Sequence, residues 1–183
     1  MLSITGGLFK GFRLITPRGI RPTSAKVRQA LGNILANRFQ GARVLDGFAG
    51  SGAAGIEALS RGAAFVAFVD SQTDAILAIR DNLQRLQTRL PSHAWRVVHL
   101  DLDRGLLHLA KVEKSFDLVF LDPPYQSPEG KKALISVVQC AILAPSGIVV
   151  VEHDRRTLTP SDVGPLTRYR QHRYGETVLS FYT

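Results

Sequence analysis

Hydrophobic residues along this chain change their spacing near Gly41, and the part that follows alternates between two patterns. Short apolar runs, typical of buried strands, alternate with stretches whose apolar positions recur every three or four residues, as on one face of a helix. The runs predict strands over Arg43–Asp46, Ala64–Asp70, Arg96–Leu100, Phe116–Asp122 and Ile148–Glu152. The periodic stretches predict helices over Ala53–Arg61, Thr73–Leu90, Arg104–Lys111 and Gly130–Leu143.

Strands as uniformly apolar as these are covered on both faces, which is typical of a parallel sheet between two layers of helices. Residues 167–182 predict two further strands around a turn at Gly175. The fold class is therefore α/β: a doubly wound, mostly parallel, Rossmann-like sheet of seven strands. Four of the predicted strands end in an acid, namely Asp46, Asp70, Asp122 and Glu152. Ligands of such sheets bind at the carboxyl ends of the strands.

The first forty residues do not follow the alternating pattern. Ser3–Ile15 has β-forming residues on both sides of a glycine-rich turn, which predicts a short β-hairpin. Thr16–Pro22 predicts a loop, and a helix with Thr23 or Ser24 as its N-cap follows. We therefore expect an N-terminal extension over residues 1–40 and one larger domain over residues 41–183.

Length and composition fit a globular protein of one main domain, with 183 residues, 45% of them hydrophobic and 21% charged. The first seven residues lack the basic and apolar regions of a signal peptide, and no apolar run approaches the roughly 18 residues of a membrane helix. Cys140 is the only cysteine, so an internal disulfide is impossible. We expect a cytoplasmic protein with no membrane partner, and a monomer by default.

The net charge of +8 is unevenly distributed along the chain. Residues 1–45 contain no acid but eight basic residues: Lys10, Arg13, Arg18, Arg21, Lys26, Arg28, Arg38 and Arg43. An ordinary solvated surface mixes its charges, so this segment favours a polyanionic partner. Nucleic acid is favoured over a membrane, since no amphipathic anchor accompanies the charge. A surface that is merely basic remains an alternative.

A glycine-rich motif, Gly50-x-Gly52-x-x-Gly55, lies directly between a predicted strand and a predicted helix. The glycines permit a tight turn and close approach of a ligand to the backbone. Such loops bind nicotinamide dinucleotides and S-adenosylmethionine alike. Asp46 favours the second, because a carboxylate at the strand end attracts a sulfonium or an amino group and repels a pyrophosphate.

Two further strand ends offer carboxylates to a nucleoside. Asp70 ends the next strand, where a carboxylate can chelate ribose hydroxyls, although a solvated strand-end acid is the alternative. Asp101 could accept from the adenine amino group, with Asp103 as a rival.

The stretch Asp122-Pro123-Pro124-Tyr125 closes a buried strand with a carboxylate, two prolines and an aromatic ring. Consecutive prolines fix φ and remove two backbone donors, so strand and helix both end here. The resulting rigid turn offers hydrogen-bond acceptors and a flat ring, which suits a planar molecule that carries an amino group. A simple proline turn is the alternative.

This motif after such a glycine loop resembles the amino-methyltransferases that modify exocyclic nitrogens of nucleic-acid bases. More specifically, the chain is similar almost end to end to the bacterial 16S ribosomal RNA guanine-N2 methyltransferase family. The segments that carry the likeness are Gly6–Gly11, Arg21–Ser24 with Val27 and Arg28, Phe48–Gly52, Glu57–Ala63, Phe116–Tyr125, Val151–His153 and Tyr174–Thr177.

The sequence departs from the family pattern at five positions. Ala25 and Gln29 stand where acids are expected, which makes the helix that would face RNA more basic. Gly32 replaces an aromatic residue, and Gly47 and Ala54 replace leucines, which puts the local packing in doubt but not the chemistry.

The resemblance implies methyl transfer from S-adenosylmethionine, without a metal, to N2 of a guanine in 16S ribosomal RNA, by convention guanine 966, during small-subunit assembly. It implies catalytic roles for Asp122, Pro123 and Tyr125. The implied cofactor residues are Asp46, Phe48, Gly50, Ser51, Gly52, Asp70 and Asp101. The implied substrate residues are Lys10, Arg13, Arg18, Arg21, Thr23, Lys26, Arg28, Pro124 and Tyr125.

Three other functions stay open at this point. The same motif serves adenine-N6 methyltransferases that act on RNA or DNA, although the chain has no separate DNA target-recognition domain. A non-catalytic RNA-binding assembly factor would be expected to lose the motif, which is complete here. A nicotinamide oxidoreductase is opposed by Asp46. His153, beside a strand-end glutamate, is assigned equally well to a functional or a structural role.

Overall fold

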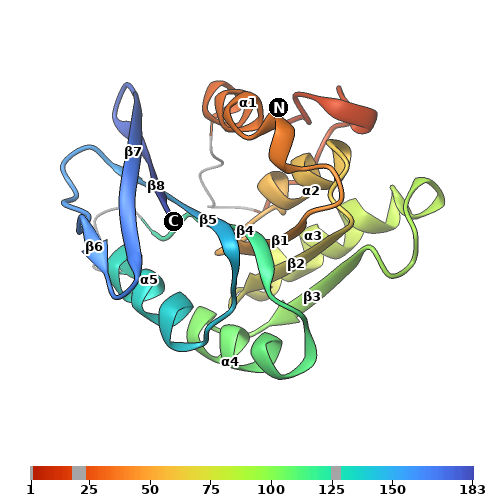
Figure 1. Ribbon diagram of the computed structural model, residues 1–183. Coiled ribbons are helices and arrows are strands. Elements are labelled where there is room, and N and C mark those ends of the chain that lie inside the picture. The colour runs from red at the N-terminus through yellow and green to blue at the C-terminus, as the bar shows by residue number, and fades with distance from the viewer. Residues whose placement is uncertain (1, 18–23, 125–128) are drawn as a thin grey trace.

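The structure is a computed structural model that describes residues 2–17, 24–124 and 129–183 (Figure 1). Within these residues one sheet has the strand order β3-β2-β1-β4-β5-β8-β7-β6. Its strands are β1 (Arg43–Gly47), β2 (Phe65–Asp70), β3 (Trp95–His99), β4 (Phe116–Leu121), β5 (Leu143–Asp154), β6 (Asp162–Val163), β7 (Leu166–Tyr174) and β8 (Thr177–Tyr182). Strands β1 to β5 pair in parallel, and β8 is antiparallel to β5 and β7. The predicted fold class is confirmed.

Helices cover both faces of the sheet because each face carries its own apolar cluster. The helices are α1 (Ala25–Ile34), α2 (Ala53–Ser60), α3 (Thr73–Gln84), α4 (Leu102–Val112) and α5 (Glu129–Gln139), with 3-10 turns η1 (Gly7–Phe9), η2 (Ala36–Arg38) and η3 (Gln87–Arg89). One cluster includes Ile56 of α2 and Ile79 of α3, and the other includes Leu106 of α4 and Leu134 of α5. None of the helices in the described part of the chain is long and apolar enough to cross a membrane.

Several elements differ from the sequence prediction, and among them the helix predicted over Gly130–Leu143 ends at Gln139. Among the described residues the sheet has eight strands rather than seven. The additional strand is β6, which pairs with β7 at the edge of the sheet and, at two residues, is too short to show an apolar run. β5 begins at Leu143 instead of Ile148, since its pairing with β4 continues across an irregularity after the Phe116–Leu143 pair. The helix predicted to reach Leu90 ends at Gln84, and η3 follows it.

The N-terminal segment has the path of a hairpin but not its regular strands. One antiparallel bridge joins Ser3 to Arg13, and η1 forms the turn between them. Ile4 and Phe12 share a backbone hydrogen bond of 3.0 Å. The predicted helix is present as α1, and Ser24 is its N-cap, because the Ser24 hydroxyl accepts from the N–H of Val27 at 3.2 Å.

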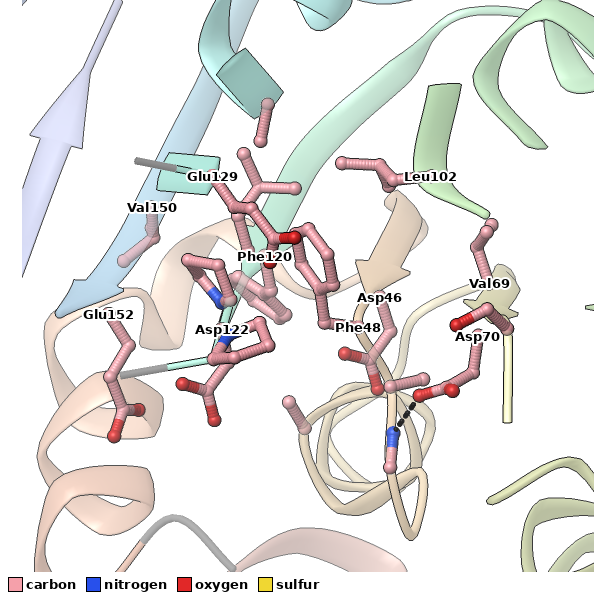
Figure 2. A pocket seen from close by; sticks show the side chains of 18 of the residues that line it. Asp46, Phe48, Val69, Asp70, Leu102, Phe120, Asp122, Glu129, Val150 and Glu152 are labelled. Atoms are coloured by element: carbon pink, nitrogen blue, oxygen red, sulfur yellow. Dashed lines mark hydrogen bonds between the residues drawn. The ribbon is translucent and has the colours of Figure 1, made fainter. Parts of the chain in front are cut away.

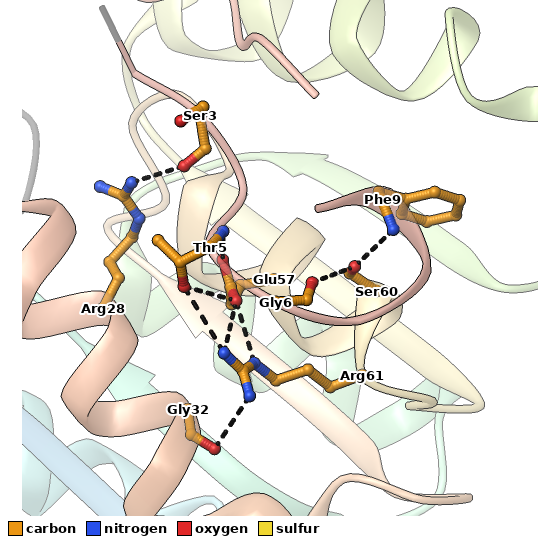
Figure 3. Close-up of polar contacts among 9 residues, drawn as sticks. All are labelled: Ser3, Thr5, Gly6, Phe9, Arg28, Gly32, Glu57, Ser60 and Arg61. Atoms are coloured by element: carbon orange, nitrogen blue, oxygen red, sulfur yellow. Dashed lines mark hydrogen bonds and ion pairs between the residues drawn. The ribbon is translucent and has the colours of Figure 1, made fainter. Parts of the chain in front are cut away.

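Polar contacts fix this segment to α2 (Figure 3). The backbone N–H and hydroxyl of Thr5 both donate to the Glu57 carboxylate at 2.8 Å. The Ser60 hydroxyl donates to the Gly6 carbonyl at 2.6 Å and accepts from the N–H of Phe9 at 2.8 Å. The segment also contributes apolar side chains to the core cluster on the α2 face, among them Ile4, Phe9 and Leu14.

Candidate active site

A cavity of about 580 Å³ lies at the carboxyl ends of β1, β2, β4 and β5 (Figure 2). Among the acids that line it, four stand at the ends of strands, and the strand order places them in the sequence Asp70, Asp46, Asp122 and Glu152 along this edge of the sheet. Figure 2 shows the Asp122 side chain between those of Glu152 and Asp46. The strand-end acids that the sequence singled out are therefore brought together in one site.

The glycine loop between β1 and α2 has the backbone geometry that only glycine adopts easily. Gly50 and Gly52 have φ values of 54° and 74°. A Cβ on Gly55 would lie 2.3 Å from the ring of Phe68, so glycine allows α2 to pack closely on β2. The Asp46 carboxylate accepts from the N–H of Gly55 at 2.8 Å and joins the loop to the strand end.

Asp70 holds the loop from the other side. One of its carboxylate oxygens accepts from the N–H of Gly50 and the other from the N–H of Gln72, both at 2.8 Å. A carboxylate has about four lone-pair sites, so Asp70 keeps acceptor capacity for further donors in the cavity. This position and capacity are compatible with the predicted contact to ribose hydroxyls.

Burial changes the charge of Asp46. The pKa of its carboxyl is raised from 3.8 to about 8, first by burial, which disfavours the charged form, and further by the negative charges of Asp122 and Asp70. The N–H of Gly55 opposes this rise. The folded protein therefore keeps this proton up to a higher pH than the unfolded chain does. As a consequence, the contribution of Asp46 to the free energy of unfolding is largest below pH 3.8, decreases as the pH rises and is lost above about pH 8.

The other predicted cofactor residues also line the cavity. Phe48 has a positive φ of 59°, unusual for a residue with a side chain, and its ring points into the cavity (Figure 2). Ser51 is buried, and its carbonyl accepts from the amide of Asn82 at 3.1 Å. Asp101 caps α4 by accepting from the N–H of Arg104 at 3.0 Å, while Asp103 accepts from Ser136. Both acids line the cavity, so the predicted adenine contact of Asp101 stays a prediction.

The proline turn is described only in part. Asp122, Pro123 and Pro124 line the cavity, and the backbone N–H of Asp122 donates to the carbonyl of Gly47 at 3.4 Å. Tyr125, the predicted stacking ring, lies outside the described residues.

The predicted RNA-contacting residues divide into three groups. The exposed ones are Lys10, Arg13 and Lys26. Arg18, Arg21 and Thr23 lie outside the described residues. The third group is Arg28: only 2% of this residue is exposed, because it packs beneath the N-terminal segment and donates to the Ser3 carbonyl at 2.8 Å, and its predicted contact to RNA stays a prediction. Arg28 is also part of the cavity lining.

His153 has structural partners. One of its ring nitrogens bonds with the carbonyl of Asp154 at 2.9 Å and the other with the hydroxyl of Ser180 at 2.8 Å. Burial is the main cause that lowers the pKa of this histidine. The ring thus joins β5 to β8, and the structural assignment is favoured.

Sequence reasoning missed the part of the cavity wall that comes from helices. Leu31 of α1, Leu102 of α4 and the pair Glu129 and Lys132 of α5 line it. Helix periodicity indicates which side of a helix is apolar, but not which turn of it reaches a strand end. Among the residues that the structure describes, no three His, Cys, Asp or Glu side chains gather in a way that could hold a metal ion.

The strand order and the acid-lined cavity beside a glycine loop are those of a Rossmann-like α/β protein with a ligand site at its strand ends, and the similar proteins named below make it a methyltransferase. The chain belongs to the family described as Conserved hypothetical protein 95, whose sequence model matches residues 2–183. The family resemblance predicted from the motifs is confirmed.

Two relatives and one solved structure illustrate the match. "Putative rRNA methyltransferase YlbH" of Bacillus subtilis is 38% identical over 183 residues, which is 99% of this chain and 98% of the relative. "Ribosomal RNA small subunit methyltransferase D" of Escherichia coli K12 is 30% identical over 183 residues, covering 99% and 89% of the two chains. The structure of "Putative methyltransferase yhhF" from Escherichia coli has a TM-score of 0.84 at 30% identity, covering 99% of this chain and 96% of that one.

Proposed function

We propose that this protein transfers a methyl group from S-adenosylmethionine to the exocyclic N2 amine of a guanine in 16S ribosomal RNA, by convention guanine 966, during assembly of the small subunit. The observation that carries the proposal is the position of Asp122 and Pro123 in the same cavity as the glycine loop. The names of the relatives, which include two ribosomal RNA methyltransferases, support RNA as the substrate.

The residues of the cavity fit this cofactor. Asp46 and its acidic neighbours favour a cationic ligand, and the open backbone at Gly50 and Gly52 lets a nucleoside approach closely. Asp70 has acceptor capacity for ribose hydroxyls. When bound, S-adenosylmethionine supplies an electrophilic methyl group on a sulfonium.

The protein's own residues then act on the amine. An exocyclic amine conjugated to a purine is a poor nucleophile, because its lone pair is delocalised. The Asp122 carboxylate and the Pro123 carbonyl accept its hydrogens, draw the nitrogen towards tetrahedral geometry and aim its lone pair at the methyl group. Alignment of this kind can supply much of the rate. The proton leaves afterwards, to Asp122 or to water.

We assign RNA binding to residues 1–40. The exposed cations Lys10, Arg13 and Lys26 contact phosphates, together with Arg18 and Arg21 of the segment that the structure does not describe. Tyr125 stacks on the target base, which must leave its helix to enter the cavity. Such a stack contributes about 1–3 kcal/mol.

The test is methyl transfer from radiolabelled S-adenosylmethionine to deproteinised and to partly assembled small-subunit RNA from cells that lack the protein. We expect label in N2-methylguanosine after nuclease digestion. Asp122→Ala should lower kcat at least about 100-fold, the usual scale for a group that handles a proton, while affinity for S-adenosylhomocysteine persists.

The other outcomes separate the alternatives. Label in N6-methyladenosine would keep the chemistry of Asp122 and overturn the choice of base. No label on any RNA, in a protein that binds the cofactor, would favour a non-catalytic assembly factor.

A further inference from the structure

Glu152 is a buried acid on the side of Asp122 that faces away from the glycine loop. It lies near the end of β5, is 8% exposed and lines the cavity. Leu121 pairs with Val151 in parallel register, so Asp122 and Glu152, one residue further on, lie at the same level of neighbouring strands. Neighbouring strands lie about 4.8 Å apart, and residues in register project to the same face of the sheet. The two carboxylates thus stand next to each other at one wall of the cavity.

The two ends of the cavity differ in the acids that line them, and we assign the two ends different roles. Asp70 and Asp46 bond to the backbone of the glycine loop and of the residues after β2, so they belong to the end proposed for the cofactor. Glu152 lies at the opposite end, beyond Asp122 (Figure 2). A base whose amine meets Asp122 can therefore turn a neighbouring ring nitrogen towards Glu152.

The positive charge of Arg28 acts on Glu152. Burial lowers the pKa of the Arg28 guanidinium, while the negative charges of Glu57 and Glu152 oppose that decrease. An arginine stays protonated in proteins, and an opposite charge nearby favours an ionised carboxylate. The positive charge of Arg28 therefore favours Glu152 as a hydrogen-bond acceptor.

The Watson–Crick edges of the two purines differ at the atom that this acceptor would meet. Guanine carries donors on both N1 and N2, whereas adenine carries a donor on N6 and a bare acceptor on N1. Two adjacent carboxylates complement the pair of donors in guanine and repel the N1 lone pair of adenine. A site that is built to bond to a substrate N–H rejects an analogue that lacks it far more strongly than an apolar pocket can.

We propose that Glu152 is the specificity-determining residue that accepts a hydrogen bond from N1–H of the target guanine, while Asp122 engages the N2 amine. The proposal rests on the methyl-transfer function proposed above and adds the reason why guanine, rather than adenine, is the base. Glu129 also lines the cavity, but it belongs to α5 and does not share the strand level of Asp122.

The test uses small-subunit RNA in which the target guanine is replaced by 2-aminopurine, which keeps the N2 amine and lacks N1–H. We expect the wild-type protein to prefer guanine strongly. Glu152→Gln should lower kcat/KM for guanine about 10- to 100-fold, the range for loss of a hydrogen bond to a charged group. It should also reduce the preference for guanine over 2-aminopurine at least about tenfold on the same scale, because the Gln amide can donate to the N1 lone pair.

Two further variants serve as controls. Glu152→Asp keeps an acceptor-only group and should retain the preference for guanine, with lower activity. Glu176→Gln removes a carboxylate from an exposed residue between β7 and β8, and it should change neither substrate's kcat/KM.

The outcomes distinguish this inference from the function on which it rests. An unchanged ratio of guanine to 2-aminopurine in Glu152→Gln, in a protein that still binds S-adenosylhomocysteine, would overturn the role of Glu152 and leave guanine methylation intact. Label in an adenine of unmodified RNA would overturn both.

Discussion

The protonation of Asp46 is coupled to the charge of a ligand bound in the cavity. Its pKa of about 8 means that the carboxyl is largely protonated at neutral pH in the free protein. A positive charge placed in the cavity favours the carboxylate, because opposite charges stabilise each other most strongly where water is excluded. Binding of a cationic ligand should therefore expel the proton.

We predict that binding of S-adenosylmethionine near pH 7 releases up to one proton per molecule. The release should vanish well above pH 8, where Asp46 is already ionised, and below about pH 4, where the carboxyl stays protonated in both states. Calorimetric titrations in buffers of different ionisation enthalpy measure the number directly. Asp46→Asn is the matched control, and equal proton release from this variant would contradict the assignment.

Glycines at two other positions make room for an arginine. A Cβ on Gly32 would lie 2.4 Å from the Arg61 guanidinium carbon, and one on Gly6 would lie 2.3 Å from a guanidinium nitrogen. Arg61 in turn pairs with Glu57 at 2.9 Å (Figure 3). The guanidinium thus takes the space that a side chain at Gly32 or at Gly6 would need.

At the scale of elements, the contact between α2 and β2 decides how the glycine loop is held. The ring of Phe68 is fully buried against α2, and a Cβ on Gly55 would lie 2.3 Å from it. A helix normally gains stability when alanine replaces glycine, by about 0.5–1 kcal/mol. Here the new methyl group would overlap both Phe68 and Val66.

We predict that Gly55→Ala lowers the free energy of unfolding by about 1–3 kcal/mol, the usual cost of overpacking a core. Urea denaturation followed by circular dichroism measures it. Gly130→Ala in α5 is the matched control, because its Cβ would meet Val151 and Pro123 at ordinary distances of 3.6 and 3.7 Å. A Gly55 variant as stable as the Gly130 variant would show that α2 can move away from the sheet.

The elements that sequence predicts well are those whose burial is complete. Every residue of β2 is buried, so its apolar run is unambiguous. The start of β5 was missed because Pro145 and Gly147 suggest a turn, while the pairing with β4 continues across an irregularity. The short hairpin expected at the N-terminus is present as one antiparallel bridge, between Ser3 and Arg13, with cross-strand backbone hydrogen bonds beside it, but it does not extend into regular strands.

The candidate site, like the fold, could be predicted from the sequence only in part. Strand-end acids and the glycine loop could be predicted, because parallel strands bring their carboxyl ends to one edge. The burial of Arg28 could not, because the charge of a residue does not reveal that a segment 25 residues away will cover it.

At the scale of the whole molecule, the basic N-terminal segment is part of the main core rather than an appendage. Deleting it to test RNA binding would also remove Ile4, Phe9 and Leu14 from the cluster on the α2 face. The exposed cations offer a cleaner test, since their side chains can change without loss of buried apolar surface.

We predict that the triple variant Lys10→Gln, Arg13→Gln, Lys26→Gln binds small-subunit RNA more weakly at low salt and with a smaller salt dependence. Loss of three phosphate contacts should reduce the slope of log K against log salt by about 2–3. Filter binding from low to moderate salt measures it. The control variant Lys111→Gln, Lys114→Gln, Lys131→Gln removes the same charge from exposed positions on or beside α4 and α5, and equal slopes in the two variants would contradict the proposed surface.

The attachment of Thr5 to Glu57 has a consequence for biosynthesis. The two residues are 52 positions apart, so the apolar side chains of the N-terminal segment leave the ribosome well before α2 exists to receive them. During that interval Ile4, Phe9 and Leu14 remain accessible on a nascent chain, where exposed apolar surface promotes aggregation and attracts chaperones. The order of synthesis thus requires this segment to wait for residues made later before it can fold.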